Sequence, residues 1–387
     1  MLYIKPLSLL SVPMVFMYIH QMHYTRAMEK KSIYYTVLLF TCLGLLACDS
    51  KTTNAPEEFS TFTIKRGTNI AHWLSQSQRR GEERVTFFTQ RDIAFIDSAG
   101  FDHIRMPIDE MQMWDEAGNR EEEAFELLKN SLTWCRDAGL RVIVDLHILR
   151  SHHFNEKEKP LWTVPAEQDK FIALWKDLSV FLKDWPTGMV AYEFMNEPVA
   201  DDHELWNTLL ARVADSIRQW EPQRVLVIGS NRWQSADTFD HLKIPANDPN
   251  IILSFHFYEP FFLTHYQASW THLKDFTGEV NYPGQIVLNS EKPEHKEIYN
   301  RARLVEMMRK PLHLADSLNL PLYCGEFGII DKSARGPMVA WYKDMVSIFD
   351  EYGIGYANWN YKAGSFGTVD KDMKPDVEIL QILTGKH

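Results

Sequence analysis

Short apolar runs alternate with longer amphipathic segments along the chain from about residue 64 to residue 360. The run Val142-Ile-Val144 and the run Val225-Leu-Val-Ile228 are continuously apolar, which is typical of strands buried on both faces of a parallel sheet. A third run, Met189 to Met195, stops just before Pro198, which cannot continue a central strand. The pattern predicts eight strands, near residues 64–70, 102–107, 141–147, 189–196, 224–229, 251–257, 321–326 and 355–360.

The segments between these runs repeat apolar residues every three or four positions, as amphipathic helices do. Gly139 and Gly353 stand where two of these helices would end, because glycine readily adopts the left-handed cap conformation. Alternating strands and helices predict an α/β fold, a single (β/α)8 TIM barrel. A doubly wound open sheet would carry a glycine-rich turn after its first strand, and Thr68-Asn-Ile-Ala-His72 offers none. The predicted helices lie near residues 89–99, 121–138, 167–184, 203–219, 234–241, 297–317 and 336–352.

The longest connection, about residues 258–296, follows the sixth predicted strand and is rich in aromatic residues. A loop of this length in a compact domain is usually functional, so we interpret it as one wall of a substrate cleft. The alternative is a surface excursion that covers the side of the barrel.

The front of the chain resembles an export signal. Lys30 and Lys31 precede an apolar stretch, residues 33–47, that is shorter than the roughly 20 residues of a membrane span. Residues 1–27 do not fit a signal peptide, so we expect Met28 to be the true start. Leu45-Leu-Ala-Cys48 resembles the lipobox of bacterial lipoproteins, which implies cleavage before Cys48 and a lipid on its sulfur. A plain signal peptide with a chance cysteine is the alternative.

We therefore divide the chain into a signal segment (1–47), a lipidated Cys48 with a polar linker (48–60), and one domain (61–387). The expected location is the cell envelope, as a lipoprotein of the outer membrane or cell surface with its domain outside the cytoplasm. The membrane would be contacted only through the lipid, and we expect a monomer.

Composition and charge limit the classes of function that the protein can have. Hydrophobic content of 45% and charged content of 24% are ordinary for a globular protein. A net charge of −11 disfavours nucleic-acid binding, which needs a surface that neutralises phosphates. Of four cysteines, Cys135 and Cys324 fall in predicted buried elements, and we expect both to be free thiols. The 12 tryptophans indicate either a large aromatic core or a cleft that stacks on sugar rings.

Polar residues end most of the predicted strands. Glu197, preceded by Asn196, ends the fourth strand, and Glu326 ends the seventh. In parallel barrels this end of the strands carries the chemistry, and two carboxyl groups are what a carboxylate-pair hydrolase needs. The other strand ends supply Arg105, Asp145, His147, His256, Tyr258 and Trp359.

Taken in order, these segments resemble glycoside hydrolase family 5, the cellulase-type family in the clan of retaining (β/α)8 glycosidases. The resemblance covers about residues 64–362. The matching segments are Ile104-Arg-Met-Pro107, Asp145-Leu-His147, Asn196-Glu-Pro198, Ser254-Phe-His-Phe-Tyr258, Gly325-Glu-Phe-Gly328 and Asn358-Trp359.

The resemblance implies that Glu197 is the acid/base and Glu326 the nucleophile, with carboxyl groups about 5–5.5 Å apart. It implies no cofactor and no metal. It also implies that Arg105 and Tyr258 hold Glu326 and that Asn196 binds the sugar 2-hydroxyl. The remaining substrate-binding residues would be His147, His256 and Trp359. Candidate sugar platforms elsewhere are Trp73, Trp114, Trp162, Trp233 and Trp270.

Two further carboxylates and a histidine group need weighing. Glu193 shares a strand face with Glu197 but lies four residues deeper, so we expect it to be structural. Glu259 ranks well below Glu326. His152 and His153 follow His147 closely, as in some metal sites, but no His-X-His pair ends the first strand, so we do not favour a metal-dependent hydrolase.

The predicted function is a retaining, endo-acting β-glycanase that hydrolyses β-1,4-linked glucan, either cellulose-like or mixed-linkage. The alternatives within the family are a β-mannanase and a xyloglucanase. The alternative from another class is a non-catalytic glycan-binding lipoprotein of the cell surface. Such proteins usually lose a catalytic carboxylate, whereas Glu197 and Glu326 are both present here.

Overall fold

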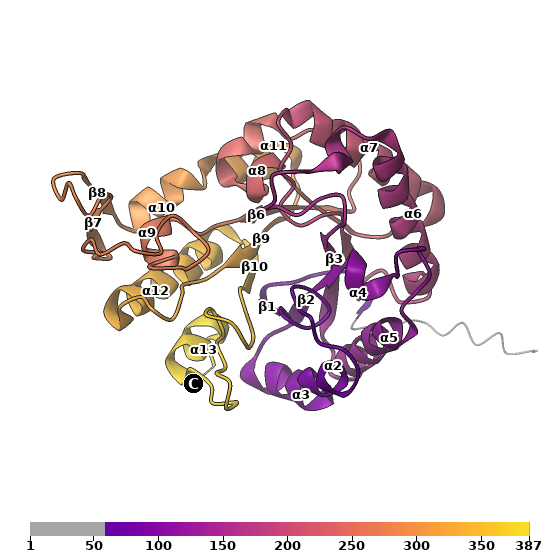
Figure 1. Ribbon diagram of the computed structural model, residues 1–387, viewed down its shortest axis with the longest axis horizontal. Helices are drawn as coiled ribbons and strands as arrows, with labels where there is room; N and C mark the ends of the chain where they lie inside the picture. Colours follow the sequence, from indigo (N-terminus) through magenta and orange to yellow (C-terminus); the bar gives the residue numbers. More distant parts are fainter. Residues whose placement is uncertain (1–58, 387) are drawn as a thin grey trace, which may run out of the picture. The chain divides into compact units, whose positions relative to one another are not determined.

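The computed structural model describes residues 59–386, and its central feature is a closed barrel of eight parallel strands. Around the barrel the strands follow the order β1-β10-β9-β6-β5-β4-β3-β2, so each pairs with its neighbours in sequence apart from the hairpin β7–β8 (Figure 1). The (β/α)8 prediction is confirmed. The barrel strands are β1 (Arg66–Asn69), β2 (His103–Asp109), β3 (Arg141–Ile148), β4 (Val190–Glu193), β5 (Leu226–Gly229), β6 (Ile251–His256), β9 (Leu322–Phe327) and β10 (Gly355–Asn358).

Helices surround the strands and bury their apolar faces against them (Figure 1). The helix predicted at 297–317 is in fact two helices preceded by a strand. Pro311 lies in the first turn of the second helix and has no N–H to donate to the carbonyl of Met307, the last residue of the first helix, so the two are not continuous there. The main helices are α3 (Gln90–Ala99), α5 (Glu122–Asp137), α6 (Pro165–Leu182), α7 (His203–Trp220), α10 (Arg301–Met307), α11 (Arg309–Leu318) and α12 (Arg335–Tyr352).

Short elements occupy the loops and the end of the chain. Of these, only the segment 236–241 falls within a predicted helix, the short one near 234–241. They are α2 (Glu82–Phe87), α4 (Glu110–Met113), η2 (Pro160–Trp162), α8 (Asn231–Gln234), η3 (Ala236–His241), α9 (Phe261–Thr264) and α13 (Val377–Thr384).

The interior of the barrel changes from apolar to charged along the strands. One buried layer holds Ile143 of β3, Ala191 of β4 and an apolar residue from each of four other strands. Two residues further along the same strands, Asp145 and Glu193 are register partners. The charged layer therefore lies toward the carboxyl ends of the strands.

The long connection after β6 divides into two parts. Its second part forms the antiparallel hairpin of β7 (Gly284–Val287) and β8 (Lys296–Tyr299), which lies outside the barrel beyond α10 and α12 in Figure 1. Tyr282 donates a 2.7 Å hydrogen bond to Asp344 of α12. This part is the surface excursion over the barrel side, so only the first part, with α9, remains a candidate cleft wall.

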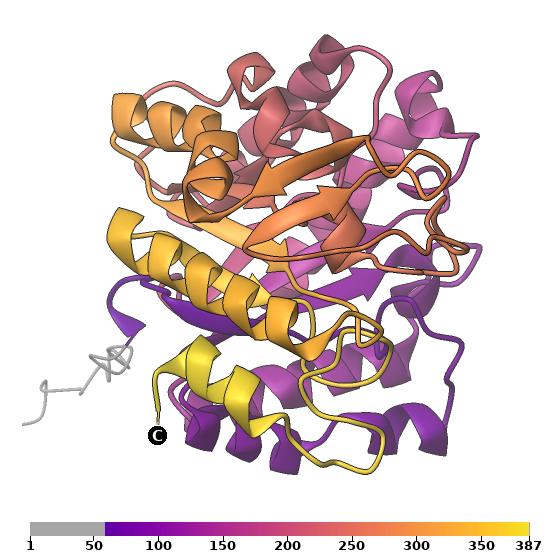
Figure 2. The ribbon, with the colours of Figure 1, turned by 90° about the vertical axis from the view of Figure 1, so that its left-hand side faces the viewer.

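The first described residues lie at the amino-terminal end of the strands. Phe59 is buried, and a Cβ at Gly188, just before β4, would lie 2.1 Å from the Phe59 carbonyl oxygen. In Figure 2 this segment lies at the left, opposite the side to which the barrel strands point. Because Phe59 packs on the barrel, the folded unit begins before residue 61.

Several predictions concern residues outside the described range. The signal segment, the lipidation of Cys48 and most of the linker lie there. Within residues 59–386, no helix is both long and apolar enough to cross a membrane. Cys135 and Cys324 are free and buried, which confirms that prediction.

Candidate active site

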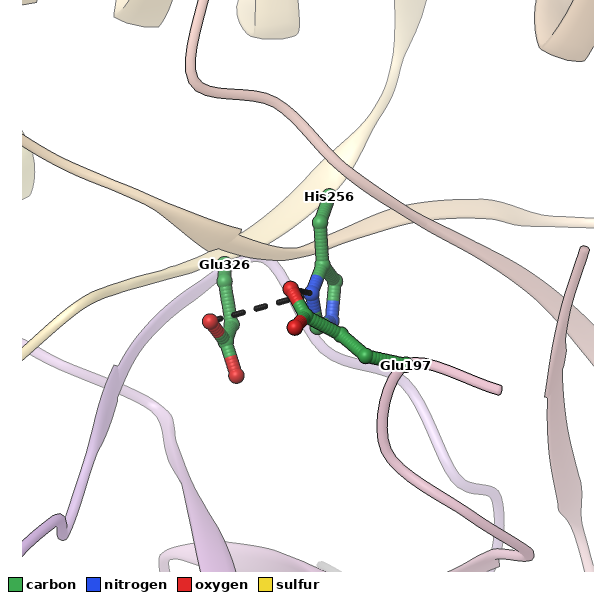
Figure 3. Close-up of side chains that lie close together, drawn as sticks. All are labelled: Glu197, His256 and Glu326. Carbon is green, nitrogen blue, oxygen red and sulfur yellow. Dashed lines mark hydrogen bonds and ion pairs between the residues drawn. The ribbon is translucent and has the colours of Figure 1, made fainter. Parts of the chain in front are cut away.

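Glu197 and Glu326 face each other at the carboxyl end of the barrel, with His256 between them (Figure 3). His256 Nδ1 lies 2.9 Å from Glu197 Oε1 and 3.7 Å from Glu326 Oε2. One oxygen of each carboxyl group and one ring nitrogen of His256 all lie within 4.8 Å of one another. The fold creates this arrangement because His256 and Glu326 are register partners on β6 and β9.

Both oxygens of Glu326 are held by donors. Arg105 Nη1 donates to Oε1 at 2.8 Å, and the Tyr258 hydroxyl donates to Oε2 at 2.9 Å. Hydrogen bonds from a cation and a hydroxyl favour the ionised form of a carboxyl group. The structure therefore brings together three residues that the sequence analysis assigned to one function.

Arg105 is fully buried and links several strands. Its Nε and Nη2 atoms donate to the two oxygens of Glu193 at 2.6 and 3.0 Å. It also donates to Asn69 Oδ1 at 2.9 Å, and Asp145 Oδ2 lies 3.0 Å from its Nη2. Glu193 thus anchors the guanidinium that holds Glu326, which gives a structural basis for the role expected of it.

Asn196 presents a free donor to the site. Its Oδ1 accepts a 2.8 Å hydrogen bond from Arg105, which fixes the amide so that Nδ2 points elsewhere. Nδ2 is buried and has no hydrogen-bond partner in the described part of the chain. A buried amide donor without a protein partner is rare, and at a strand end beside two carboxyl groups it marks a candidate contact for a ligand oxygen.

The two glutamates differ in what surrounds them. Burial raises the pKa of Glu197 well above its ordinary range, and the Glu326 charge raises it further. Burial also raises the pKa of Glu326, but the Arg105 charge and the Tyr258 hydrogen bond act against that rise. A single proton shared by the pair therefore resides on Glu197, and Glu326 carries the charge.

His256 is neutral, because burial and the nearby Arg105 charge hold its pKa well below the ordinary value. Nδ1 faces both carboxyl groups, so the ring hydrogen is best placed on this nitrogen. From there it donates to Glu197 Oε1. Nε2 is buried and without a partner in the described residues.

Trp359 and His147 form a stacked pair, with ring centroids 5.6 Å apart and planes 7° apart. His147 Nδ1 lies 2.7 Å from Asp145 Oδ2, and Gln76 Nε2 lies 3.2 Å from His147 Nε2. Because the amide nitrogen of Gln76 can only donate, His147 carries its hydrogen on Nδ1. Burial lowers the pKa of His147 to about 3, so the imidazole is neutral.

The tryptophans proposed as sugar platforms differ in how much of their surface is exposed. Trp73 and Trp114 are buried and donate to Arg84 O and Asp177 Oδ2, so the platform hypothesis is wrong for both. Trp162 is almost buried and packs against Trp206. Trp233 and Trp270 expose 44% and 56% of their surfaces and remain candidates.

Trp270 continues an aromatic cluster that begins beside Glu326. Tyr258 contacts His265 edge-to-face, with ring centroids 5.0 Å apart. His265 in turn packs against Trp270 and Phe366, at 6.3 and 5.3 Å. The first part of the long connection thus carries aromatic surface outward from the two glutamates.

The described residues do not support the two other sites considered, a catalytic Glu259 and a metal site made of histidines. Glu259 Oε2 accepts the backbone N–H of Phe261 and does not join the glutamate pair. His152 Nε2 accepts the backbone N–H of Val199, and burial holds its pKa near 3. Within residues 59–386, the one cluster with metal-ligand spacing is Glu197, His256 and Glu326. His147, His152 and His153 therefore do not form a metal site together.

Gln234 and Gln76 contact the site, and the sequence analysis did not select either. Gln234 Oε1 accepts the backbone N–H of Glu197 at 2.9 Å. Neither glutamine belongs to a motif or ends a strand, so the chain carries no signal that marks them.

Comparisons with known proteins agree with this geometry. The sequence model of the family "Cellulase (glycosyl hydrolase family 5)" matches residues 64–365. Endoglucanase C of Acetivibrio thermocellus is 33% identical over 339 residues, covering 83% of this chain and 98% of that protein. Cellodextrinase A of Ruminococcus flavefaciens is 30% identical, covering 75% of this chain and 83% of its own. A solved endoglucanase structure superposes with a TM-score of 0.69 at 26% identity, covering 84% and 97% of the two chains. The chain therefore belongs to glycoside hydrolase family 5.

Proposed function

We propose that this protein is a retaining, endo-acting β-glycanase that hydrolyses β-1,4-linked glucan. The observation that carries the proposal is the pair formed by Glu197 and Glu326, whose nearest oxygens lie within 4.8 Å. Retaining glycosidases hold their carboxyl groups about 5–5.5 Å apart, whereas inverting enzymes need about 6.5–9.5 Å to admit a water. The similarity to endoglucanase C and cellodextrinase A supports a β-1,4-glucan as the substrate.

In the first step, Glu326 attacks the anomeric carbon and Glu197 protonates the leaving oxygen. Arg105 and Tyr258 keep Glu326 ionised and aimed. The raised pKa of Glu197 keeps its proton available near neutral pH. His256 holds one oxygen of Glu197, which leaves the other free to face the glycosidic bond.

In the second step, water releases the sugar from Glu326, and Glu197 acts as the base. Ester formation removes the charge on Glu326, which contributes to the raised pKa of Glu197. The pKa of Glu197 then falls, so it can accept the proton of the attacking water. One residue therefore serves both steps.

The neighbouring residues bind the sugar. The free Nδ2 of Asn196 is placed to donate to a hydroxyl group beside the reacting carbon. Trp359 stacks on His147 and exposes 8% of its surface, so it would contribute to the apolar floor of the site. Trp233 and Trp270 extend the binding surface away from the glutamates.

A polysaccharide panel tests the proposal and separates the alternatives within the family. We expect the full chain to release oligosaccharides from carboxymethyl cellulose or mixed-linkage glucan, with viscosity falling before many reducing ends appear. A preference for galactomannan or for xyloglucan would identify a β-mannanase or a xyloglucanase. The matched control is Glu326→Gln, which we expect to be inactive on every member of the panel.

The same panel tests the non-catalytic alternative. A surface glycan-binding protein would bind one polysaccharide tightly and hydrolyse none. The intact glutamate pair and its supporting hydrogen bonds argue against this reading, because binding alone does not need a carboxyl group held by two donors. No hydrolysis by the wild-type chain would overturn the proposal.

We also infer that the protein is exported and anchored at the cell envelope through lipid on Cys48, and that it acts as a monomer. The lipobox-like segment supports the anchor. Metabolic labelling with palmitate, compared between wild type and Cys48→Ala, tests the anchor.

A further inference from the structure

The turn after β5 has an unusual backbone. Arg232, Trp233 and Gln234 have φ angles of 59°, 60° and 51°, so three consecutive residues lie in the left-handed region. None of them is glycine, and each therefore carries steric strain. Such strain persists only where surrounding contacts impose it, so the contacts of this turn indicate its purpose.

The strained turn directs the side chain of Gln234 into the barrel. Gln234 is buried, and its Oε1 accepts the backbone N–H of Glu197 at 2.9 Å. Its Nε2 donates to Glu193 Oε1 at 3.1 Å and lies 3.4 Å from Ser254 Oγ. Both ends of the amide are therefore used in the charged layer of the site.

The fold also leaves room for this side chain. A Cβ at Gly229, the last residue of β5, would lie 2.3 Å from Gln234 Nε2 and 2.5 Å from its Cγ. A larger residue at the end of β5 would thus expel the amide. A second contact joins the two segments, since Trp233 N donates to Pro198 O at 3.3 Å.

The partner of Gln234 is itself strained. Glu197 has a φ angle of 45°, and it lies beyond the last ladder pairing of β4 at Glu193. Its backbone is therefore not fixed by the sheet, and its N–H is held by Gln234. The direction of the Glu197 side chain follows from this backbone conformation.

We propose that Gln234 is a positioning residue that holds the left-handed backbone of Glu197 and so aims its carboxyl group at the leaving oxygen. The proposal rests on the acid/base role of Glu197 in the proposed function. Through Glu193, the same amide is linked to Arg105, which holds Glu326. Arg105 holds Glu193 with two hydrogen bonds of its own, so Glu326 keeps its support when Gln234 is replaced.

The test compares two substrates that differ in their need for an acid. Cleavage of a phenyl β-cellobioside needs a proton on the leaving oxygen, whereas a 2,4-dinitrophenyl β-cellobioside releases a stable anion without one. General acid catalysis contributes about 10²–10⁴-fold. We expect Gln234→Met to lower kcat/KM at least about 10²-fold on the phenyl substrate, since small misplacements can cost this much. On the dinitrophenyl substrate the loss should stay below about 3-fold, because that leaving group needs no proton.

Gln234→Asn is a second variant, which keeps the test valid if Gln234→Met does not fold. Asparagine tolerates the left-handed backbone, but it is one methylene too short to reach both Glu193 and Glu197. We expect the same selective loss. The matched control is Gln168→Met on α6, which removes an amide that bonds to Leu161 O and to Arg212, outside the barrel interior. We expect no change with either substrate.

The outcomes separate this proposal from the proposed function. Equal losses on both substrates, or no loss on either, would overturn the positioning role of Gln234. A wild-type chain that cleaves neither cellobioside nor any polysaccharide would instead overturn the proposed function. Wild-type cleavage together with a selective loss in both glutamine variants would support both.

Discussion

The hydroxyl group of Tyr258 donates a 2.9 Å hydrogen bond to Oε2 of Glu326. This bond stabilises the ionised carboxylate and contributes to keeping the pKa of Glu326 below what burial alone would give. We predict that Tyr258→Phe lowers kcat about 10-fold or more, because a hydrogen bond to a charged group contributes about 1.5–3 kcal/mol. The acid limb of the pH–activity profile should move to higher pH, since Glu326 then ionises less readily.

Tyr299→Phe is the matched control for this change. Tyr299 also donates to a glutamate, Glu297 Oε2, at 3.1 Å, but it lies on the β7–β8 hairpin outside the barrel. We expect its pH profile to match that of the wild type. An acid limb that stays in place in Tyr258→Phe would show that this hydrogen bond does not tune Glu326.

The different surroundings of the two glutamates predict a bell-shaped pH dependence of kcat/KM. As pH falls, Glu326 gains a proton and can no longer attack. As pH rises, Glu197 loses the proton that it must donate. Burial and the Glu326 charge raise the pKa of Glu197, so the alkaline limb lies well above the usual pKa of a glutamic acid. The wild type should show the alkaline limb on a phenyl β-cellobioside, which needs the acid, and Glu197→Ala should abolish it there. An alkaline limb that persists on the phenyl substrate in this variant would show that another group is the acid.

Exposure of Trp233 and Trp270 predicts that they bind sugars beyond the cleavage point. Replacing either with alanine should raise KM for cellohexaose about 2–13-fold, because an aromatic stacking contact contributes about 0.5–1.5 kcal/mol. Hydrolysis of a short aryl cellobioside should change little. Tyr352→Ala, an exposed aromatic at the end of α12, is the control. Equal effects on long and short substrates would contradict the platform role.

Packing inside the barrel, and not catalysis, requires a glycine at position 67 of β1. A Cβ at this position would lie 2.2 Å from His103 Nε2 and 2.4 Å from its Cε1. His103 cannot move freely, because it bonds to Asp102 Oδ1 at 2.6 Å and to the Tyr323 hydroxyl at 3.0 Å. We predict that Gly67→Ala lowers the free energy of unfolding by about 1–3 kcal/mol or more, measured with urea.

The control for this prediction is Gly336→Ala on α12, where no heavy atom lies within 4 Å of an added Cβ. Alanine favours a helix, so unfolding stability should stay the same or rise by about 0.5–1 kcal/mol. Equal stability of both variants and wild type would show that the barrel interior adapts to the extra methyl group.

The sequence predicted the barrel and most of the residues gathered at its carboxyl end, because both follow from local patterns. A buried parallel strand is a continuous apolar run, and the residue that ends it faces the site in this fold. Glu326, Arg105 and Tyr258 are therefore visible without any structure. The β7–β8 hairpin was missed because its exposed residues, such as Ile298, do not alternate clearly with polar ones.

Features that depend on loop conformation could not be predicted. Trp73 and Trp114 are packed into the core against Phe88 and Phe125, and nothing in their local sequence distinguishes them from the exposed Trp233. The contact between Gln234 and Glu197 needs three consecutive left-handed residues, yet the segment contains no glycine or asparagine within Arg232 to Gln234 to announce it. Long-range contacts impose this backbone, and local propensity opposes it.

The most direct test of the two-glutamate account is to trap the covalent intermediate. In a 2,4-dinitrophenyl 2-deoxy-2-fluoro-β-cellobioside, the fluorine destabilises the positively charged transition states of both steps. The good leaving group restores the rate of the first step, so the glycosyl-enzyme forms faster than water hydrolyses it. We predict inactivation with a mass increase of one fluorocellobiosyl group, located by peptide mapping on Glu326. Label on Glu197 or Glu193, or turnover that never produces a labelled enzyme, would contradict the account.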